Sequence, residues 1–166
     1  MDIQLKLLNI SEDNDDKYFR FLQNFPNSER FPNPALNLEK EDLEKWLIEK
    51  EEQMKETGLD KSNMQQYLYW IILDDELIGI GLIRTNLTKE YYIRGGHIGI
   101  GLSQECKGKG YGTTAMKLLI DQAKNIHKIK KCLITIMDSN LPSRKIAEKN
   151  GAILKNIENH ICYYWC

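Results

Sequence analysis

The spacing of hydrophobic residues predicts a strand and two helices in the first part of the chain. The strand is expected at Ile3–Leu8. A helix with Ser11 as its N-cap follows, because apolar residues recur there at i, i+3, i+4 and i+7, on one helix face. These residues are Tyr18, Phe21, Leu22 and Phe25. After a proline-rich loop, a second helix is expected from about Glu39 to Gly58, where the glycine is a natural end.

The middle of the chain predicts three antiparallel strands. Two apolar runs, Tyr67–Leu73 and Leu77–Arg84, flank the acidic turn Asp74–Glu76 and are typical of a β-hairpin. A third strand is expected at about Tyr92–Leu102. One face of this strand carries Ile98, Ile100 and Leu102, and the other carries His97, Gly99 and Gly101. The first face therefore belongs to the core, and the second is nearly bare backbone.

Helical and strand patterns alternate in the C-terminal part. Helical spacing of apolar residues begins at Gly112. The segment Cys132–Met137 is a continuous apolar and β-branched run, as expected for a central strand that is covered on both faces. A short helix at Leu141–Asn150 is expected to stop at Gly151, and the last strand is expected at Ile161–Trp165. This order of elements predicts an α/β sandwich with a mixed sheet, built as a single domain over residues 1–166.

Composition points to a folded protein with a small-molecule partner. The chain has 166 residues, of which 42% are hydrophobic and 28% charged, and its formal net charge is −1. This apolar content excludes disorder along the whole chain, and the near-zero charge argues against a dedicated nucleic-acid-binding protein. The first residues do not resemble a signal peptide, and no apolar run is long enough to span a membrane, so a cytoplasmic protein is expected. The four cysteines form no CxxC pair, and no histidine or cysteine spacing indicates a metal site.

The segment Lys107–Thr113, between a predicted strand and a predicted helix, carries the densest chemical signal. Its three alternate glycines allow positive φ angles and a close approach of a ligand to the backbone. The unpaired amides in the first turn of the helix favour an anion such as phosphate, and two lysines add positive charge. The segment matches neither a Walker A loop nor a dinucleotide fingerprint. Two alternatives stay open: a tight turn without a ligand, and a nucleotide-phosphate site, which lacks the hydroxyl and acidic residues expected for Mg²⁺.

Several segments resemble the GNAT superfamily of N-acetyltransferases. Lys107–Gly112 resembles the loop that binds the pyrophosphate of coenzyme A, with a lysine where the motif has glutamine or arginine. Asp138–Ala152 resembles the region after the fifth strand of the superfamily, and Gly95–Leu102 resembles a strand with the letters GGHIG in a subgroup of predicted acetyltransferases. The hairpin turn at Asp74–Gly79 is similar as well. The resemblance covers about residues 67–166.

The resemblance implies a mixed, mostly antiparallel sheet of six or seven strands flanked by about four helices. It implies transfer of the acetyl group of acetyl-CoA to a primary amine of a small molecule or peptide, by direct attack in a ternary complex and without a metal. The acceptor pocket is expected to be formed by the N-terminal helices and the loop Pro26–Leu38, opposite the cofactor, and homodimers are common among such domains. Residues expected to bind acetyl-CoA are Leu102, Lys107, Gly108, Lys109, Gly110, Tyr111, Gly112, Thr113, Asn140 and Ser143. Asn140 has a second interpretation, as the cap of the helix that follows it.

His97 is the candidate catalytic residue. An ammonium group must lose a proton before it attacks, and a histidine with a pKa near 6.5 suits a general base. The alternative is a half-buried histidine that is satisfied by backbone hydrogen bonds. The tyrosine that serves relatives as general acid is replaced here by Ala147, so no acid is assigned. The candidates to replace this tyrosine as general acid are Tyr111, Tyr163 and Tyr164. A thiolate can also leave without a proton from an acid.

Two further functions are kept as alternatives. The missing tyrosine at Ala147 makes a non-enzymatic module that binds or senses acyl-CoA a second hypothesis. Cys106 borders the basic loop, and a cysteine nucleophile would need a histidine and a carboxylate beside it. An inert cysteine is the simpler interpretation.

Overall fold

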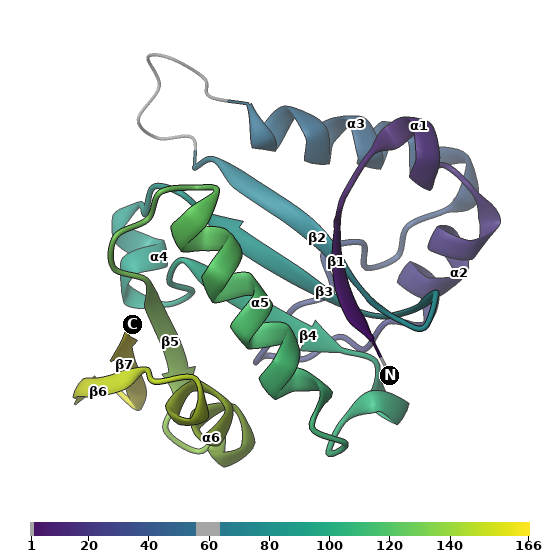
Figure 1. The fold of residues 1–166 in the computed structure, drawn as a ribbon. Coiled ribbons are helices and arrows are strands. Elements are labelled where there is room, and N and C mark those ends of the chain that lie inside the picture. The colour runs from purple at the N-terminus through teal and green to yellow at the C-terminus, as the bar shows by residue number, and fades with distance from the viewer. Residues whose placement is uncertain (1, 56–63) are drawn as a thin grey trace.

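The computed structural model describes residues 2–55 and 64–166, which form seven strands and six α-helices (Figure 1). The strands are β1 (Ile3–Leu7), β2 (Gln66–Leu73), β3 (Glu76–Arg84), β4 (Ile98–Leu102), β5 (Leu133–Met137), β6 (Ile153–Glu158) and β7 (Ile161–Trp165). The helices are α1 (Ile10–Asp13), α2 (Asp16–Asn24), α3 (Leu43–Met54), α4 (Lys89–Ile93), α5 (Tyr111–Asn125) and α6 (Leu141–Lys149). Two short 3₁₀ helices, η1 (Lys40–Asp42) and η2 (Gln104–Cys106), precede α3 and follow β4. None of the helices in these two ranges is long and apolar enough to cross a membrane.

The strands form two antiparallel sheets. One has the order β1-β2-β3-β4 and the other the order β5-β7-β6. Within the described ranges, a single bridge between Gly96 and Ile134 joins the two sheets, and β4 and β5 diverge from it (Figure 1). The predicted mixed α/β fold with mostly antiparallel strands is confirmed. The division into two sheets positions the site, because it leaves one edge of β4 without a partner strand.

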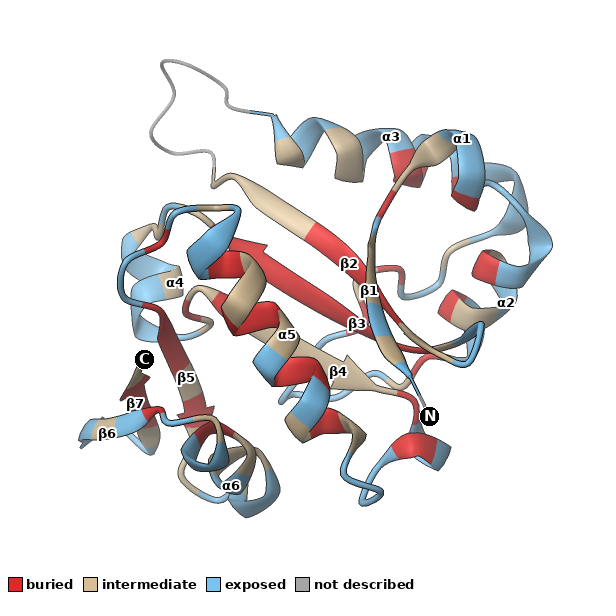
Figure 2. Cartoon of the chain, viewed as in Figure 1, coloured by how far each residue is buried: buried red, intermediate tan, exposed pale blue. Residues whose placement is uncertain are grey.

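Helices cover both faces of the four-stranded sheet. On one face α2 and α3 enclose Trp70, whose side chain is fully buried. On the other face α5 packs Leu119 against Ile83 and Ile98. Buried residues follow the middle strands and the inner side of α5 (Figure 2). Because the sheet is held from both sides, the free edge of β4 is a rigid element.

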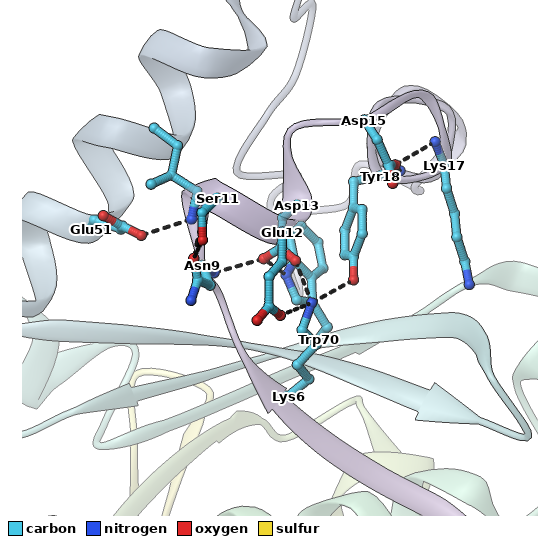
Figure 3. Close-up of polar contacts among 11 residues, drawn as sticks. Lys6, Asn9, Ser11, Glu12, Asp13, Asp15, Lys17, Tyr18, Glu51 and Trp70 are labelled. Atoms are coloured by element: carbon cyan, nitrogen blue, oxygen red, sulfur yellow. Dashed lines mark hydrogen bonds and ion pairs between the residues drawn. The ribbon is translucent and has the colours of Figure 1, made fainter.

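A buried polar cluster joins α1 to strands β1 and β2 (Figure 3). The side chain of Asp13 is fully buried and accepts hydrogen bonds from Lys6 Nζ (2.6 Å), the Asn9 amide (2.7 Å) and Trp70 Nε1 (2.7 Å). Partial burial works to lower the pKa of Lys6, but hydrogen bonds to Asp13, Tyr18 and other partners outweigh it and raise this pKa. Every carboxylate oxygen of Asp13 is thus satisfied, as a buried charge requires.

The helix expected after Ser11 is in fact two helices. Asn9 caps α1, because its Oδ1 accepts a hydrogen bond from the Ser11 amide at 2.9 Å. Asp15 caps α2 through a bond from the Lys17 amide at 2.8 Å. The prediction of Ser11 as the N-cap is therefore wrong, since the carboxamide two residues earlier takes that role. The helix end expected at Gly58 lies outside the described residues.

The first half of the strand expected at Tyr92–Leu102 is α4 and a turn. Thr88 caps α4 by accepting a hydrogen bond from the Tyr91 amide at 3.4 Å. Gly95 and Gly96 then take φ angles of 137° and 68°, which turn the chain into β4. The side-chain cap and the two glycines outweigh the strand preference of the tyrosines and isoleucine between them. Only the second half of this prediction, from Ile98 onward, is correct.

Most other elements match their predictions closely, but β5, which was expected to be a central strand, is an edge strand of the three-stranded sheet. The acidic hairpin turn is present, with Asp74 and Asp75 at positive φ angles of 46° and 69°. Gly151 follows α6 with a φ of 80°, as expected of a glycine that ends a helix. The sequence did not predict β6, because its apolar residues Ile153, Leu154 and Ile157 do not alternate with polar ones. It is an edge strand whose residues are mostly exposed.

Candidate active site

The free edge of β4 is the first component of the site. The Arg84 amide donates to the His97 carbonyl, and the Ser103 amide donates to the Ile78 carbonyl, each at 2.8 Å. The backbone groups of the odd-numbered residues along β4 therefore form the hydrogen bonds to β3. Pairing alternates along an antiparallel strand. The backbone groups that point away from β3, toward β5, are therefore those of Ile98, Ile100 and Leu102. An extended chain with amide groups can add to such an edge as a further strand would.

The loop between η2 and α5 is the second component. Gly108 and Gly110 have φ angles of 75° and 86°, and no atom lies within 4 Å of the position that a Cβ would take on either glycine. The predicted positive φ is confirmed at these two residues. In the described part of the chain the amides of Gly108, Lys109 and Gly110 donate to no backbone oxygen. The amides of these three residues, just before α5, suit an anion.

Gly112 has a packing role, and its predicted part in binding acetyl-CoA stays a prediction. It lies inside α5, and a Cβ on it would come within 2.9 Å of Ile146 Cδ1 on α6. Its lack of a side chain therefore lets α5 and α6 approach each other. Thr113, next to it, is half-buried, and its amide donates to the Gly110 carbonyl at 3.1 Å.

The glycine face of β4 is not bare, which corrects the expectation from the sequence. A Cβ on Gly101 would lie 2.6 Å from Phe31 Cδ1 and 2.9 Å from Phe25 Cζ. A Cβ on Gly99 would lie 3.5 Å from Phe31 Cε2. These glycines make room for two aromatic rings of the N-terminal part. A ligand arm along β4 must therefore use its free edge, not this face.

A cavity of about 380 Å³ lies where β4 and β5 diverge. Its walls come mainly from the loop after α2, from α4 and the turn after it, from β3, β4 and β5, and from the start of α6. Single residues of β2, α5 and β7 complete the lining. Two contacts hold the loop over the cavity: Arg94 lies 3.6 Å from Glu29, and Arg30 donates to Asn140 Oδ1 at 3.5 Å. The loop expected to form the acceptor pocket thus lines this cavity.

Asn140 and Ser143 both line the cavity, whereas the loop around Gly110 lies at the far end of β4. Asn140 also caps α6, accepting a hydrogen bond from the Ser143 amide at 3.4 Å. Both interpretations of Asn140 therefore fit the structure. Leu102 ends β4, beside the apolar cluster that also contacts Tyr111 at the start of α5.

Arg84, at the end of β3, is a cavity residue that the sequence did not indicate. Its exposed fraction is only 8%. Nε donates to Gln66 Oε1 at 2.9 Å, and one terminal nitrogen donates to the Gly96 carbonyl at 3.2 Å. The guanidinium lies 4.7 Å from the centre of the Tyr91 ring. Burial lowers the pKa of Arg84. In the sequence it looks like the polar end of an apolar strand, so only the fold reveals it.

His97 links the two sheets. Its amide donates to the Leu133 carbonyl at 2.7 Å, and its Nδ1 accepts from the Leu133 amide at 2.8 Å. Burial and the nearby charge of Arg84 lower the pKa of His97, so the ring is neutral near pH 7. A neutral ring that accepts at Nδ1 carries its proton on Nε2, which leaves no free lone pair. The catalytic role of His97 stays a prediction, and this geometry weighs against it.

Two substitutions separate a supporting role of His97 from a catalytic one. His97→Asn keeps an oxygen that can accept from Leu133, whereas His97→Ala leaves that buried amide without an acceptor. For a supporting role we expect the alanine variant to lose about 1–3 kcal/mol of stability in denaturant unfolding, and the asparagine variant to keep most stability and turnover. If the asparagine variant is stable but loses turnover as fully as the alanine variant, His97 is the base.

Acid should weaken the native protein through the same residue. Folding lowers the pKa of His97 below its ordinary 6.5, so the unfolded chain binds the proton first. Its contribution to stability is therefore complete above about pH 6.5 and declines as the pH falls below that value. Unfolding free energies of the protein and of His97→Asn, measured from pH 5 to 8, should converge toward the acid end. Parallel curves would contradict this.

None of the stand-in tyrosines lines the cavity. The hydroxyl of Tyr164 donates to Glu148 at 2.7 Å, and that of Tyr163 donates to a carbonyl of α4 at 3.0 Å. Burial raises the pKa of both. Tyr111 packs at the start of α5, outside the cavity walls. Tyr91 does line the cavity, but the sequence placed it beside a strand and gave no chemical reason to select it.

Two other positions considered from the sequence supply no catalytic group. Ala147 is fully buried, so no side chain takes the place of the usual tyrosine. Cys106 is buried in an apolar cluster with Ile71, Ile78 and Ala115, an environment in which a thiol is inert. In the described ranges no group of three or more His, Cys, Asp or Glu side chains is placed to hold a metal ion.

Comparison with known proteins identifies both a family and a fold. A family model described as an acetyltransferase (GNAT) domain matches residues 4–153. The N-acetyltransferase PseH of Campylobacter jejuni, solved with acetyl coenzyme A, superposes with a TM-score of 0.61 at 16% identity, over 99% of this chain and 97% of that one. The spermidine/spermine N-acetyltransferase SpeG of Vibrio cholerae gives a TM-score of 0.62 at 16% identity, over 99% and 91%. No curated protein sequence gives a significant match.

Proposed function

The chain belongs to the GNAT acetyltransferase family and is an acyltransferase, and on that premise we propose that it moves the acetyl group of acetyl-CoA to a primary amine by direct attack in a ternary complex. The observation that carries this proposal is one continuous path. The open amides around Gly110 lie at one end of β4, the unpaired backbone of β4 follows, and the cavity lies at the other end.

Each part of the path suits one part of acetyl-CoA. The amides of Lys109 and Gly110 suit the pyrophosphate, with Lys107 and Lys109 adding positive charge. The unpaired backbone of Ile100 and Leu102 suits the amide groups of the pantetheine arm. Asn140 and Ser143 lie on the opposite wall, toward α6. With acetyl-CoA bound in this way, we expect the acetyl group to lie in the cavity, where an amine can reach it.

The acceptor enters from the side of the N-terminal loop. Glu29, Arg30 and Phe31 of that loop line the cavity on this side, and α5 contributes Met116 to its lining. SpeG is named as a spermidine/spermine N-acetyltransferase. We do not extend a polyamine acceptor to this chain, because three arginines and one glutamate line its cavity, a charge balance that repels a polycation.

A module that binds acyl-CoA without turnover is the second candidate. The observation that favours it is Ala147, which is fully buried and supplies no proton to the departing thiolate. A thiolate with an ordinary thiol pKa can leave without an acid, so transfer remains the first candidate.

Acetylation of a panel of primary amines tests the proposal. The protein is incubated with acetyl-CoA and each amine, and the product is detected as the acetylated amine by mass spectrometry. We expect enzyme-dependent product with at least one amine and none when CoA replaces acetyl-CoA. Tight binding of acetyl-CoA without any acetylated product would favour the binding module and contradict the transferase.

A further inference from the structure

We infer that the acceptor amine carries an anionic group, a carboxylate or a phosphate, which binds to Arg84 inside the cavity. The inference rests on the proposed function, because it names the class of substrate for that site. It begins from an arginine that is 8% exposed, lines the cavity and has no acidic partner among the described residues.

Among the described residues, the hydrogen bonds and ring contact of Arg84 are all with neutral groups. They are the Gln66 amide oxygen at 2.9 Å, the carbonyls of Gly96 at 3.2 Å and Gly95 at 3.5 Å, and the ring of Tyr91 at 4.7 Å. A buried charge is expensive unless an opposite charge compensates it. These contacts explain how Arg84 holds the turn after α4. They do not explain why a cation does so, since neutral donors would serve two carbonyls equally well.

One nitrogen of the guanidinium is left for a ligand. The bonds of Arg84 use Nε and Nη1, whereas Nη2 donates to no acceptor in the described residues. In the described ranges, Ser103 Oγ is the one fully buried side-chain nitrogen or oxygen atom that lacks a hydrogen bond. Since Nη2 also lacks a hydrogen bond, it is not fully buried and remains accessible. Arg84 belongs to the cavity wall. A guanidinium edge that faces a cavity is suited to a carboxylate or phosphate oxygen.

The residues at the rim of the cavity carry a net positive charge, as Arg84 does. Arg30 and Arg94 line it together with a single carboxylate, Glu29, which lies 3.6 Å from Arg94. The bond from Arg30 is to the neutral Asn140. Three cations and one anion around a partly enclosed space attract anions and repel cations. The charge balance of the rim therefore supports the same class of acceptor as Arg84.

Matched acceptors test the inference. The panel consists of ω-amino acids and ω-aminoalkyl phosphates of increasing chain length, with the alkylamines and diamines of the same lengths. We expect kcat/KM for the best anionic amine to exceed that of its neutral counterpart by about tenfold to a hundredfold, the range of a hydrogen-bonded charge pair, and diamines to be poorest. Preference within the anionic set distinguishes carboxylate from phosphate.

The variant Arg84→Gln should reduce this ratio to near one. Lys117→Gln on α5 is the control, because it removes one positive charge from an exposed residue outside the cavity and should leave the ratio unchanged. Should Arg84→Gln fail to fold, butanoate and propyl phosphate replace it as probes. They should inhibit the unmodified protein competitively against the amine, whereas butanol should not.

The possible outcomes distinguish a failure of this inference from a failure of the proposed acetyl transfer. Neutral or cationic amines that are acetylated as well as anionic ones overturn the inference and leave acetyl transfer intact. If no amine is acetylated, transfer fails, and the subsite is judged by binding. A thermal shift with butanoate or propyl phosphate that Arg84→Gln removes then supports it, and the absence of any shift overturns it.

Discussion

Replacing Gly110 by aspartate is expected to weaken acetyl-CoA binding by a hundredfold or more. The substitution places a carboxylate among the amides that we assign to the pyrophosphate. It also forces an ordinary residue into a φ of 86°, which shifts those amides. Each charge-assisted hydrogen bond contributes about 1.5–3 kcal/mol, so the loss of two accounts for this factor. Titration calorimetry with acetyl-CoA measures it directly.

Gly151→Asp is the matched control for this experiment. Gly151 has a similar φ of 80°, and no atom lies within 4 Å of its Cβ position, as for Gly110. It follows α6, outside the loop Lys107–Gly110 that we assign to the pyrophosphate. Both variants should lose a similar amount of stability, about 1–2 kcal/mol from the left-handed backbone, but only Gly110→Asp should lose acetyl-CoA. Equal loss of affinity in the two variants would show that destabilisation, not the loop, is responsible.

Asp13→Ala is expected to lower the free energy of unfolding by about 3–5 kcal/mol. The substitution leaves the Lys6 ammonium without its buried partner, and it leaves the Trp70 indole and the Asn9 amide without an acceptor. These groups join β1, α1 and β2 (Figure 3). Denaturant unfolding followed by tryptophan fluorescence measures the effect, because Trp70 is fully buried.

Glu12→Gln provides the comparison on the same lysine. Glu12 lies 2.9 Å from Lys6 Nζ, but its side chain is 59% exposed, and exposed ion pairs contribute about 0–1 kcal/mol. We therefore expect a small change here and a large one at Asp13. Folding raises the pKa of Lys6 above its ordinary 10.5, so the cluster stabilises fully below that pH and less above it. A loss at Asp13 no greater than that at Glu12 would mean that burial does not control the energy of this cluster.

Local sequence signals predicted the elements that depend on neighbouring residues. The hairpin turn requires two positive φ angles, which aspartates tolerate, and the pair Asp74 and Asp75 supplies them. The glycines at positions 108 and 110 indicated the loop before α5 for the same reason. In each case the backbone requirement is visible in adjacent residues, without knowledge of the fold.

The remaining features depend on residues that are distant in the sequence. Gly99 and Gly101 indicated a close approach to β4, but not whether a ligand or the rings of Phe25 and Phe31 would make it. The role of Arg84 depends on a turn more than ten residues later and on a missing acidic partner. The division into two sheets follows from the turn at Gly96, and pairing between strands far apart in the chain leaves no local pattern.

The central claim is that the loop before α5 and the free edge of β4 hold acetyl-CoA. Thermal unfolding with acetyl-CoA or ATP at equal concentration tests it most directly. A ligand at a hundred times its dissociation constant adds about 2.7 kcal/mol of stability, so acetyl-CoA should raise the melting temperature clearly and ATP should not. A shift with ATP and none with acetyl-CoA would contradict the account.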